Sequence, residues 1–330
     1  MKFLSYIFLF FSFYTSSSQI VHKRSTFLLG SPFEITLVGK DTLEINTNID
    51  IAISELKRIE NLISDWIPTS QVSEINRNAG IKPVVVPSEL IDLIERSIKI
   101  SKLTDGAFDI TYASMDKIWK FDGSMKSMPT PEEIRKSVEK VGFKNIIINK
   151  ENSSVYLKIN GMKMGFGGIG QGYIADKIKE LLVSKGVVSG IINVSGDIST
   201  WGRQPNGDQW RIAIKNPLNK SKVFATFPLE DIAVETSGSY EKYVVFNNKK
   251  YSHIIDTRTG YPVQGVSSVT VFAKTTELAD ALATGIFVMG VEVGIDLINQ
   301  LPGVGCIMVD DNGKIYSTKS IDINNYKNEN

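Results

Sequence analysis

The sequence predicts an α+β fold of two intimately joined lobes, with mixed or antiparallel sheets and flanking helices. Helical patterns are concentrated in the first half of the chain, whereas most strand patterns follow one another in the second half. Segregated helices and strands favour an α+β fold over a doubly wound sheet, in which the two alternate. The chain has 330 residues without a repeat or a long linker, so we expect residues 19–330 to form one domain with two lobes.

The composition is that of an ordinary globular protein and excludes several classes. Hydrophobic residues make up 42% and charged residues 22% of the chain, which is not the balance of a disordered protein. The formal net charge of +1 gives no electrostatic basis for nucleic-acid binding, and we predict no such partner. The single cysteine, Cys306, excludes an internal disulfide, and the chain lacks the cysteines and histidines of a zinc site. Any metal must therefore be a hard cation held by oxygen atoms.

Residues 1–18 have the pattern of a secretory signal peptide. They begin with one lysine, continue through an aromatic-rich apolar run and end in small residues before Gln19. The run is short for a membrane span, and an uncleaved anchor is the alternative. Since no cysteine lies near the cleavage region, we predict an exported protein that is not a lipoprotein.

A strand pattern opens the part of the chain that follows, and two helix patterns come after it. Apolar and polar residues alternate over 26–38, which predicts a strand in which Gly30-Ser31-Pro32 would allow a local kink. Helical spacing of apolar residues runs from Ile49 to Ile63. A second amphipathic helix is expected from Ser88.

A short helix and a hairpin separate these helices from the second half. Thr130-Pro131-Glu132-Glu133 is a capping box with proline at the first helical position, which predicts a helix that Gly142 ends. Residues 145–149 and 155–159 have the pattern of a hairpin. Small residues predict a helix over 276–288 near the end of the chain. The strands expected in the second half are 190–194, 210–215, 223–229, 243–246, 251–254 and 266–273.

A glycine-dense turn runs from Gly165 to Tyr173 and leads into a helix that continues to about Ser184. Successive glycines before a helix let backbone N–H groups approach an anion at the helix N-terminus. The letters match G-x-G-x-x-G, but no acidic residue follows a second strand at the spacing of a dinucleotide-binding Rossmann unit. Glycines that serve only close packing of the helix are the alternative explanation.

Asp280 and Thr284 are four residues apart in a helix pattern, so their side chains point to the same side. A carboxylate and a hydroxyl suit a magnesium ion, which prefers oxygen ligands. The alternative is that Asp280 is an ordinary surface residue. This alternative is weakened because the surrounding helix is apolar on nearly every face, and a buried carboxylate needs a partner.

The segment from His253 to Pro262 combines an imidazole, a carboxylate turn and a guanidinium. Asp256 suits a local role in the turn, and Arg258 is either solvated or in contact with phosphate. His253 is either a satisfied core residue or a proton acceptor, and the chain's other histidine is His22. Near other turns, Trp66 and Phe108-Asp109 suit the stacking of a heterocycle, with ordinary packing as the alternative.

Taken in order, these and neighbouring motifs resemble those of the FAD:protein FMN transferases, the ApbE family. They span residues 29–290, nearly all of the chain after residue 18. The motifs are Gly30-Ser31-Pro32-Phe33, Ser64-Asp65-Trp66, Ser73-Glu74-Ile75-Asn76, Thr104-Asp105-Gly106-Ala107-Phe108-Asp109, Gly167-Gly168-Ile169-Gly170-Gln171-Gly172-Tyr173, Asn193-Val194-Ser195-Gly196-Asp197-Ile198, Thr236-Ser237-Gly238, the His253 segment and the Asp280–Thr284 helix.

The resemblance implies a two-lobed ApbE-like protein that binds FAD as a substrate between its lobes. It implies magnesium-dependent transfer of FMN to a threonine or serine hydroxyl of a target protein, with release of AMP. The expected target is a membrane-associated electron-transfer subunit, and the expected location is the periplasm or the outer face of the cytoplasmic membrane. A metal-dependent FAD pyrophosphatase and a non-enzymatic flavin carrier are the alternatives.

The resemblance also implies roles for particular residues. His253 would accept the proton of the incoming hydroxyl. Two departures from the family pattern stand out: Gly165 replaces a residue that is usually acidic, and Gln171 replaces a usual Lys or Glu. Mg²⁺ would be held by Asp280, Thr284 and a backbone oxygen around Gly168, and FAD would be contacted by Leu29, Trp66, Ala107, Phe108, Asp109, Gln171 and Ile254.

Overall fold

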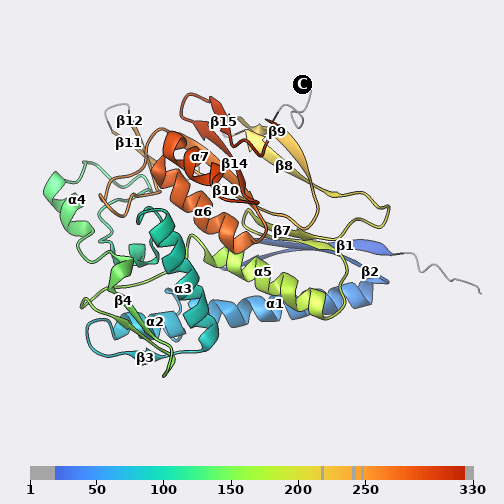
Figure 1. Cartoon of the computed structure of the whole chain (residues 1–330), viewed down its shortest axis with the longest axis horizontal. Helices are drawn as coiled ribbons and strands as arrows, with labels where there is room; N and C mark the ends of the chain where they lie inside the picture. The colour runs from blue at the N-terminus through green and yellow to red at the C-terminus, as the bar shows by residue number, and fades with distance from the viewer. Residues whose placement is uncertain (1–18, 217–218, 240–242, 247–248, 324–330) are drawn as a thin grey trace, which may run out of the picture.

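The computed structural model describes residues 19–216, 219–239, 243–246 and 249–323 (Figure 1). The predicted signal peptide, residues 1–18, lies outside them. The α+β prediction is confirmed, because helices and antiparallel sheets build two lobes that are joined side by side. No helix within the described ranges combines the length and apolarity of a membrane span.

The larger lobe is built on an eight-stranded sheet in which every neighbouring pair is antiparallel. Several of its strands are connected by tight hairpins, as antiparallel pairing permits. In order across the sheet the strands are β1 (Ile20–Leu28), β2 (Ser31–Gly39), β6 (Gly190–Val194), β7 (Asp197–Trp201), β10 (Ala233–Gly238), β13 (Val266–Ala273), β14 (Gly305–Asp310) and β15 (Ile315–Ser317).

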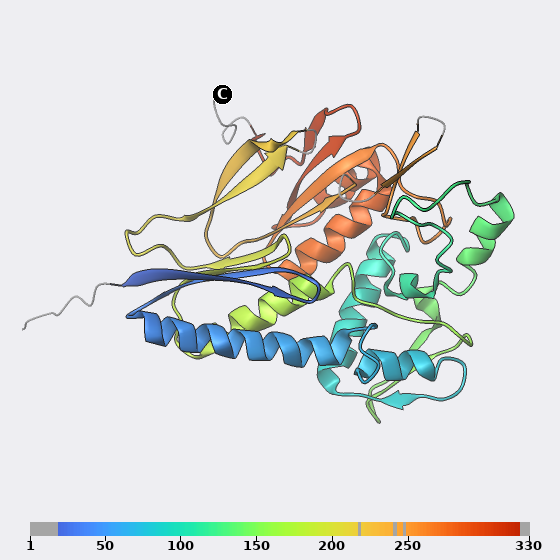
Figure 2. The ribbon, with the colours of Figure 1, turned by 180° about the vertical axis from the view of Figure 1, so that it is seen from behind.

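One face of this sheet is covered by helices and the other by a β-hairpin (Figures 1 and 2). Side chains alternate between faces along a strand. Thus Cys306 and Met308 of β14 join the apolar cluster of the helices, whereas Ile307 between them joins that of the hairpin. The covering helices are α1 (Thr42–Ile63), α5 (Gly170–Ser184), α6 (Thr276–Met289) and α7 (Val291–Asn299); the hairpin is β8 (Trp210–Asn216) with β9 (Asn219–Leu229).

The smaller lobe contains short helices and a three-stranded sheet in the order β3-β5-β4. Arg96 joins it to α6 by two hydrogen bonds to the Glu277 carboxylate, at 2.6 and 2.9 Å. The capping box that opens α4 is confirmed. The elements are α2 (Gln71–Arg77), β3 (Val84–Val85), α3 (Ser88–Leu103), the 3₁₀ helix η1 (Ile110–Ser114), α4 (Pro131–Ser137), the 3₁₀ helix η2 (Phe143–Asn145), β4 (Ile146–Asn149) and β5 (Ser154–Leu157). A separate hairpin, β11 (Tyr243–Phe246) with β12 (Lys249–Ser252), precedes His253.

The prediction of a single strand over 26–38 is wrong. Leu28 pairs with Ser31, so the chain reverses at Leu29 and Gly30 and forms the β1–β2 hairpin. Both turn residues have positive φ, 55° and 67°, which is the geometry of a type I′ two-residue turn. The pattern of alternation continues through such a turn, so alternation alone did not reveal the reversal.

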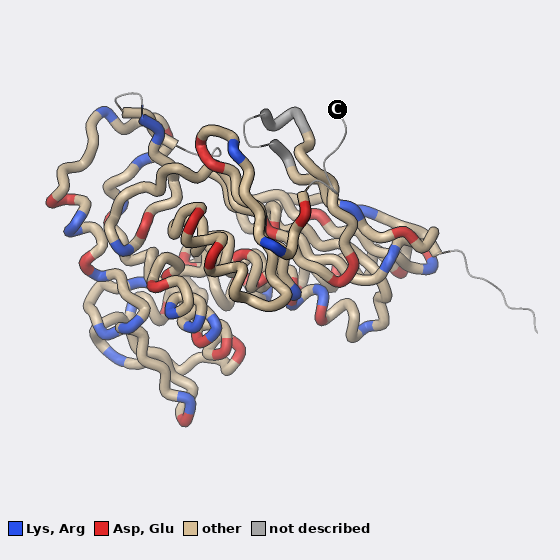
Figure 3. The backbone as a smooth tube through the Cα atoms, turned by 45° about the horizontal axis from the view of Figure 1, so that its top comes forward, with Lys and Arg blue, Asp and Glu red and all other residues tan. Residues whose placement is uncertain are grey.

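Positive and negative side chains are interspersed along the described chain (Figure 3). This distribution agrees with the net charge of +1. A nucleic-acid surface needs basic residues gathered on one face. The absence of a nucleic-acid partner stays a prediction.

Candidate functional site

A cavity of about 1110 Å³ lies between the two lobes. Its volume is slightly above the roughly 300–1,000 Å³ that is usual for small-molecule sites, so it suits a ligand of dinucleotide size. The smaller lobe contributes the loop and 3₁₀ turn from Ala107 to Met115. The larger lobe contributes the glycine turn before α5, the β6–β7 turn, β10, the segment after β12 and one side of α6.

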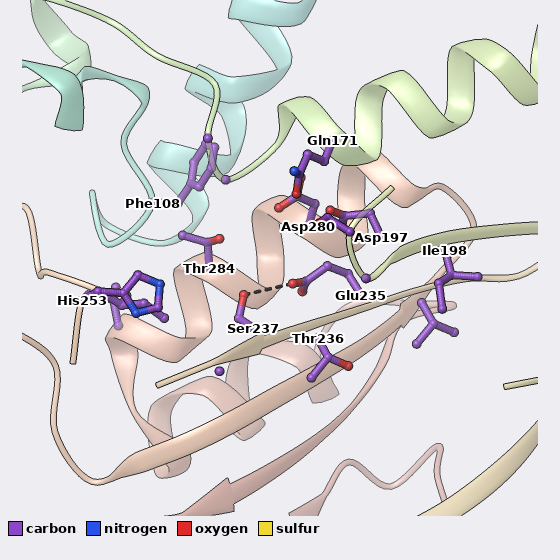
Figure 4. Close-up of a pocket in the computed structure, with 18 of the residues that line it drawn as sticks. Phe108, Gln171, Asp197, Ile198, Glu235, Thr236, Ser237, His253, Asp280 and Thr284 are labelled. Atoms are coloured by element: carbon purple, nitrogen blue, oxygen red, sulfur yellow. Dashed lines mark hydrogen bonds between the residues drawn. The ribbon is translucent and has the colours of Figure 1, made fainter. Parts of the chain in front are cut away.

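Three buried carboxylates meet at one end of this cavity (Figure 4). Asp197 begins β7, Glu235 lies in β10 and Asp280 lies in α6, and each offers an oxygen within 4.8 Å of the others. They are only 4%, 7% and 4% exposed. Among the described residues, Oδ1 of Asp197 and Oε2 of Glu235 find no hydrogen-bond partner. We refer to Asp197, Glu235 and Asp280 as the carboxylate cluster.

Burial raises the pKa of all three carboxyl groups, that of Asp280 to about 8. The negative charge of Asp280 raises the pKa values of Asp197 and Glu235 further. Three carboxylates without cationic partners are costly in a buried site unless protons or a cation neutralise them. The unpartnered oxygens therefore fit a hard divalent cation, which prefers carboxylate ligands.

The predicted metal ligands Gly168, Asp280 and Thr284 all line the cavity. A Cβ atom on Gly168 would lie 2.9 Å from Oγ1 of Thr284, so the backbone of the glycine turn almost touches that hydroxyl. Asp280 lies one turn earlier on α6 and accepts a hydrogen bond from the Gly172 N–H at 3.1 Å. The sequence reasoning missed Asp197 and Glu235 as members of this group. Asp197 is the acidic residue of the motif at 193–198, which could have indicated it. Glu235 lies in β10, a strand that the sequence analysis does not predict.

The glycine turn serves close packing and also lines the cavity, and anion binding there stays a prediction. Gly172 serves packing, because a Cβ there would lie 2.4 Å from the Thr276 carbonyl oxygen of α6. Gly165, Gly167 and Gly168 line the cavity at the N-terminal end of α5. In the first turn of α5 the Gly170 N–H donates to the Phe166 carbonyl oxygen at 2.6 Å and the Gly172 N–H donates to Asp280. An anionic ligand at this end would therefore be attracted mainly by the positive end of the helix dipole.

His253 lies on the opposite side of the cavity from the carboxylate cluster, with Phe108 and Thr284 between them (Figure 4). It directly follows β12, where Ser252 Oγ accepts a hydrogen bond from the Ile254 N–H at 2.9 Å. The edge of its ring meets Phe121 at 6.5 Å between ring centroids. His253 is thus a cavity residue and not a residue of the apolar core.

Asp256 and Arg258 shape the loop after His253. Both oxygens of Asp256 accept hydrogen bonds from the Arg258 guanidinium at 2.9 Å. Thr257 ties the loop to the smaller lobe by donating to the Gly106 carbonyl oxygen at 3.0 Å. The local role of Asp256 is confirmed, and Arg258 does not line the cavity.

The predicted FAD contacts are only partly brought together. Ala107, Phe108, Asp109, Gln171 and Ile254 line the cavity. The Asp109 carboxylate is engaged by its own loop, accepting from the N–H groups of Thr111 and Phe143 at 2.8 Å.

Leu29 and Trp66 do not line the cavity. Leu29 lies in the β1–β2 turn, and Trp66 is 76% exposed with Nζ of Lys117 4.5 Å from its ring centroid. An exposed ring beside a cation is free to contact a ligand or a protein at the surface. For these two residues, contact with FAD stays a prediction.

Known proteins share both the sequence pattern and the fold. The profile of the ApbE family matches residues 29–308. A FAD:protein FMN transferase of Klebsiella pneumoniae is 30% identical, over 91% of this chain and 92% of that protein. A FAD:protein FMN transferase of Treponema pallidum is 27% identical, over 91% of this chain and 87% of that protein.

Solved structures agree with this relationship. The ApbE protein of Thermotoga maritima superposes with a TM-score of 0.84 at 30% identity, over 94% of this chain and all of that chain. The flavin transferase ApbE of Vibrio cholerae superposes with a TM-score of 0.78 at 27% identity, over 92% of this chain and 97% of that chain. Profile, sequence and fold agree over nearly the same residues, and the chain belongs to the ApbE family.

Proposed function

We propose that this protein is a magnesium-dependent FAD:protein FMN transferase. It transfers the FMN part of FAD to a threonine or serine hydroxyl of a target protein and releases AMP. The names of its relatives support the activity, and the cavity between the lobes has the size for FAD.

The observation that carries this proposal is the placement of two kinds of group on opposite sides of one cavity. The carboxylate cluster and the start of α5 form one side, and His253 forms the other. In the reaction, the acceptor oxygen bonds to the phosphorus of FMN while the bond from that phosphorus to the bridging oxygen breaks. The released AMP keeps the bridging oxygen, and His253 takes the proton of the hydroxyl.

Asp280, Thr284 and the Gly168 carbonyl would hold the magnesium ion, with Asp197 and Glu235 facing the same space. When bound, Mg²⁺ neutralises the charge that develops on the pyrophosphate oxygens. The N–H groups at the start of α5 add positive potential on the same side. Gln171, also in this first turn, provides an amide that can bind a ligand hydroxyl or carbonyl without adding charge.

We further propose that the enzyme works outside the cytoplasm on a membrane-associated electron-transfer subunit. The support is the signal-peptide pattern of residues 1–18, together with the family resemblance. Expression of the full chain, followed by fractionation and N-terminal sequencing, tests the first part. Recovery of unprocessed protein in the cytoplasm would refute export.

The decisive experiment incubates the protein with FAD, Mg²⁺ and a threonine-containing acceptor peptide. A mass gain on the peptide equal to one FMN, with AMP in equal amount, supports the transferase. The same peptide with alanine in place of threonine is the control and should stay unmodified. Free FMN and AMP without modified peptide would instead identify a pyrophosphatase, and retained, intact FAD would identify a carrier.

A further inference from the structure

Tyr112 is a cavity residue that neither the sequence motifs nor the proposed chemistry uses. It lies in η1 of the smaller lobe, and its side chain reaches across to the glycine turn of the larger lobe. Its hydroxyl oxygen accepts a hydrogen bond from the Gly167 N–H at 3.2 Å. This contact joins the two walls of the cavity directly beside Gly168.

The space that the phenol hydroxyl occupies exists because two residues of the turn have no side chain. A Cβ atom on Gly167 would lie 2.5 Å from the Tyr112 hydroxyl oxygen, and one on Gly165 would lie 3.1 Å from it. The Cβ added at Gly165 would also lie 3.2 Å from Oδ2 of Asp65. Neither glycine has a positive φ, so backbone conformation does not demand glycine at these positions. The neighbouring phenol demands glycine at Gly167, whereas at Gly165 it leaves little space for a side chain.

We propose that Tyr112 is a positioning residue for the dinucleotide, acting through the glycine turn. The hydroxyl fixes the Gly167 N–H and thereby sets where the Gly168 backbone stands relative to Thr284 and the ligand. Its own proton remains available for an oxygen acceptor at the cavity wall. This inference rests on the proposed function in one respect only, namely that the ligand is FAD.

The electrostatic surroundings agree with a donor role. Burial, followed by the negative charge of Asp65, raises the pKa of Tyr112 to about 12, so the phenol keeps its proton at physiological pH. A neutral phenol can accept from Gly167 and donate to a second group at once. It cannot act as a general base here.

The test removes the Tyr112 hydroxyl and adds a methyl group at Gly167, first separately and then together. Tyr112→Phe removes the hydroxyl, and Gly167→Ala adds a Cβ that would lie 2.5 Å from that hydroxyl oxygen but 3.4 Å from the ring carbon that carries it. The double variant thus removes the close contact, because the methyl group lies beside the space that the hydroxyl has left. Tyr156→Phe, a half-buried tyrosine on β5 that does not line the cavity, is the matched control.

We expect Tyr112→Phe to weaken FAD binding by roughly 5- to 30-fold, the effect of one or two kcal/mol. Gly167→Ala should weaken binding and lower the melting temperature of the ligand-free protein. The double variant should recover the melting temperature and not the affinity. Affinity is measured by quenching of flavin fluorescence, and melting by calorimetry without FAD.

Several results would overturn the inference. Wild-type affinity in Tyr112→Phe would show that the hydroxyl does not position the ligand. A Gly167→Ala protein that melts like wild type, or a double variant that melts no better than Gly167→Ala, would show that the phenol does not demand glycine. Failure of wild-type protein to bind FAD would instead refute the proposed function, and the melting measurements would still test the contact.

Discussion

At the scale of single residues, the carboxylate cluster buries acidic groups whose oxygens are not all hydrogen-bonded. Asp197 and Glu235 each have an oxygen without a hydrogen-bond partner within the described chain, and Asp280 is bound by one N–H group. A residue kept for stability alone would not be an acid here, because an amide or an apolar side chain avoids the cost of burying like charges.

Asp197→Asn is therefore expected to stabilise the metal-free protein while it impairs transfer. The substitution removes a group that must either stay protonated or carry a buried charge, and each kcal/mol gained raises the melting temperature of a chain of this length by about 1–2 °C. Calorimetry in EDTA and the peptide assay measure the two effects. Asp296→Asn, an exposed position on α7, is the matched control and should change neither. A metal-free Asp197→Asn protein that melts below wild type would contradict the view that repulsion dominates at the cluster.

His253→Ala should lower the rate of transfer by roughly 10²- to 10⁴-fold and leave FAD binding within about 2-fold, since a general base acts on the acceptor and not on FAD. The loss should be smallest at high pH, where hydroxide can replace the base. His22→Ala on β1 removes the chain's other histidine, outside the cavity lining, and should behave as wild type. Near-normal transfer by His253→Ala would refute the role of this residue.

At the scale of elements, the site depends on how closely α5 approaches α6. Gly172 lies against the Thr276 carbonyl, and Asp176, one turn later on α5, accepts from the N–H groups of Thr276 and Glu277 at 2.9 and 2.8 Å. This carboxylate thus caps α6, the helix that carries Asp280 and Thr284. A displacement of α5 relative to α6 would therefore also move the proposed metal ligands on α6.

Gly172→Ala is expected to lower the melting temperature and to weaken the stabilisation by Mg²⁺. A Cβ at this position would meet Asp280 Cβ at 2.9 Å as well as the Thr276 carbonyl, so α5 and α6 must separate. Overpacking of this kind typically costs about 1–3 kcal/mol. Calorimetry with and without Mg²⁺ measures both effects. Val183→Ala, an exposed position on the same helix, is the control. If Gly172→Ala melted at the same temperature as the wild type, α5 and α6 would have space for the added Cβ and the expected overpacking would be refuted.

Elements with strong local signals could be predicted from the sequence, and elements set by tertiary pairing could not. The capping box of α4 and the strand Val266–Ala273 were identified correctly, because cap chemistry and β-branched residues act locally. The strand β10 was missed, since Glu235 and its polar neighbours are held there by pairing with β13. Missing this strand also meant missing one member of the carboxylate cluster.

At the scale of the whole molecule, the cluster should make stability depend on pH and on magnesium. Its folded-state pKa values lie above the ordinary range of about 3.9–4.3, and that of Asp280 is about 8. The folded state therefore retains protons that the unfolded state has released, and the free energy of unfolding falls as pH rises from about 4 to about 8. Below about pH 4 these carboxyl groups are protonated in both the folded and the unfolded state, so their contribution to the free energy of unfolding has its full value.

The measurement is urea denaturation at about pH 5 and about pH 8, in EDTA and in Mg²⁺. The loss of stability between the two pH values should be smaller for Glu235→Gln than for wild type, because one such group has been removed. Mg²⁺ should offset the loss, since it binds the deprotonated carboxylates and its affinity rises with pH. In EDTA, the free energy of unfolding of the wild type, taken relative to that of Glu235→Gln, should fall as pH rises. A rise would contradict the predicted direction.

The origin of the cluster in β7, β10 and α6 also has a consequence for the lifetime of the folded protein. These segments lie far apart in the chain, so the three carboxylates come together only after the sheet has formed and α6 has docked on it. We expect interactions completed that late to be absent from the folding transition state and to act mainly on the unfolding rate. A cation held there would slow unfolding without speeding folding. Under the export and the magnesium site proposed above, bound Mg²⁺ would then also protect the protein against proteases when cleavage outpaces reclosing.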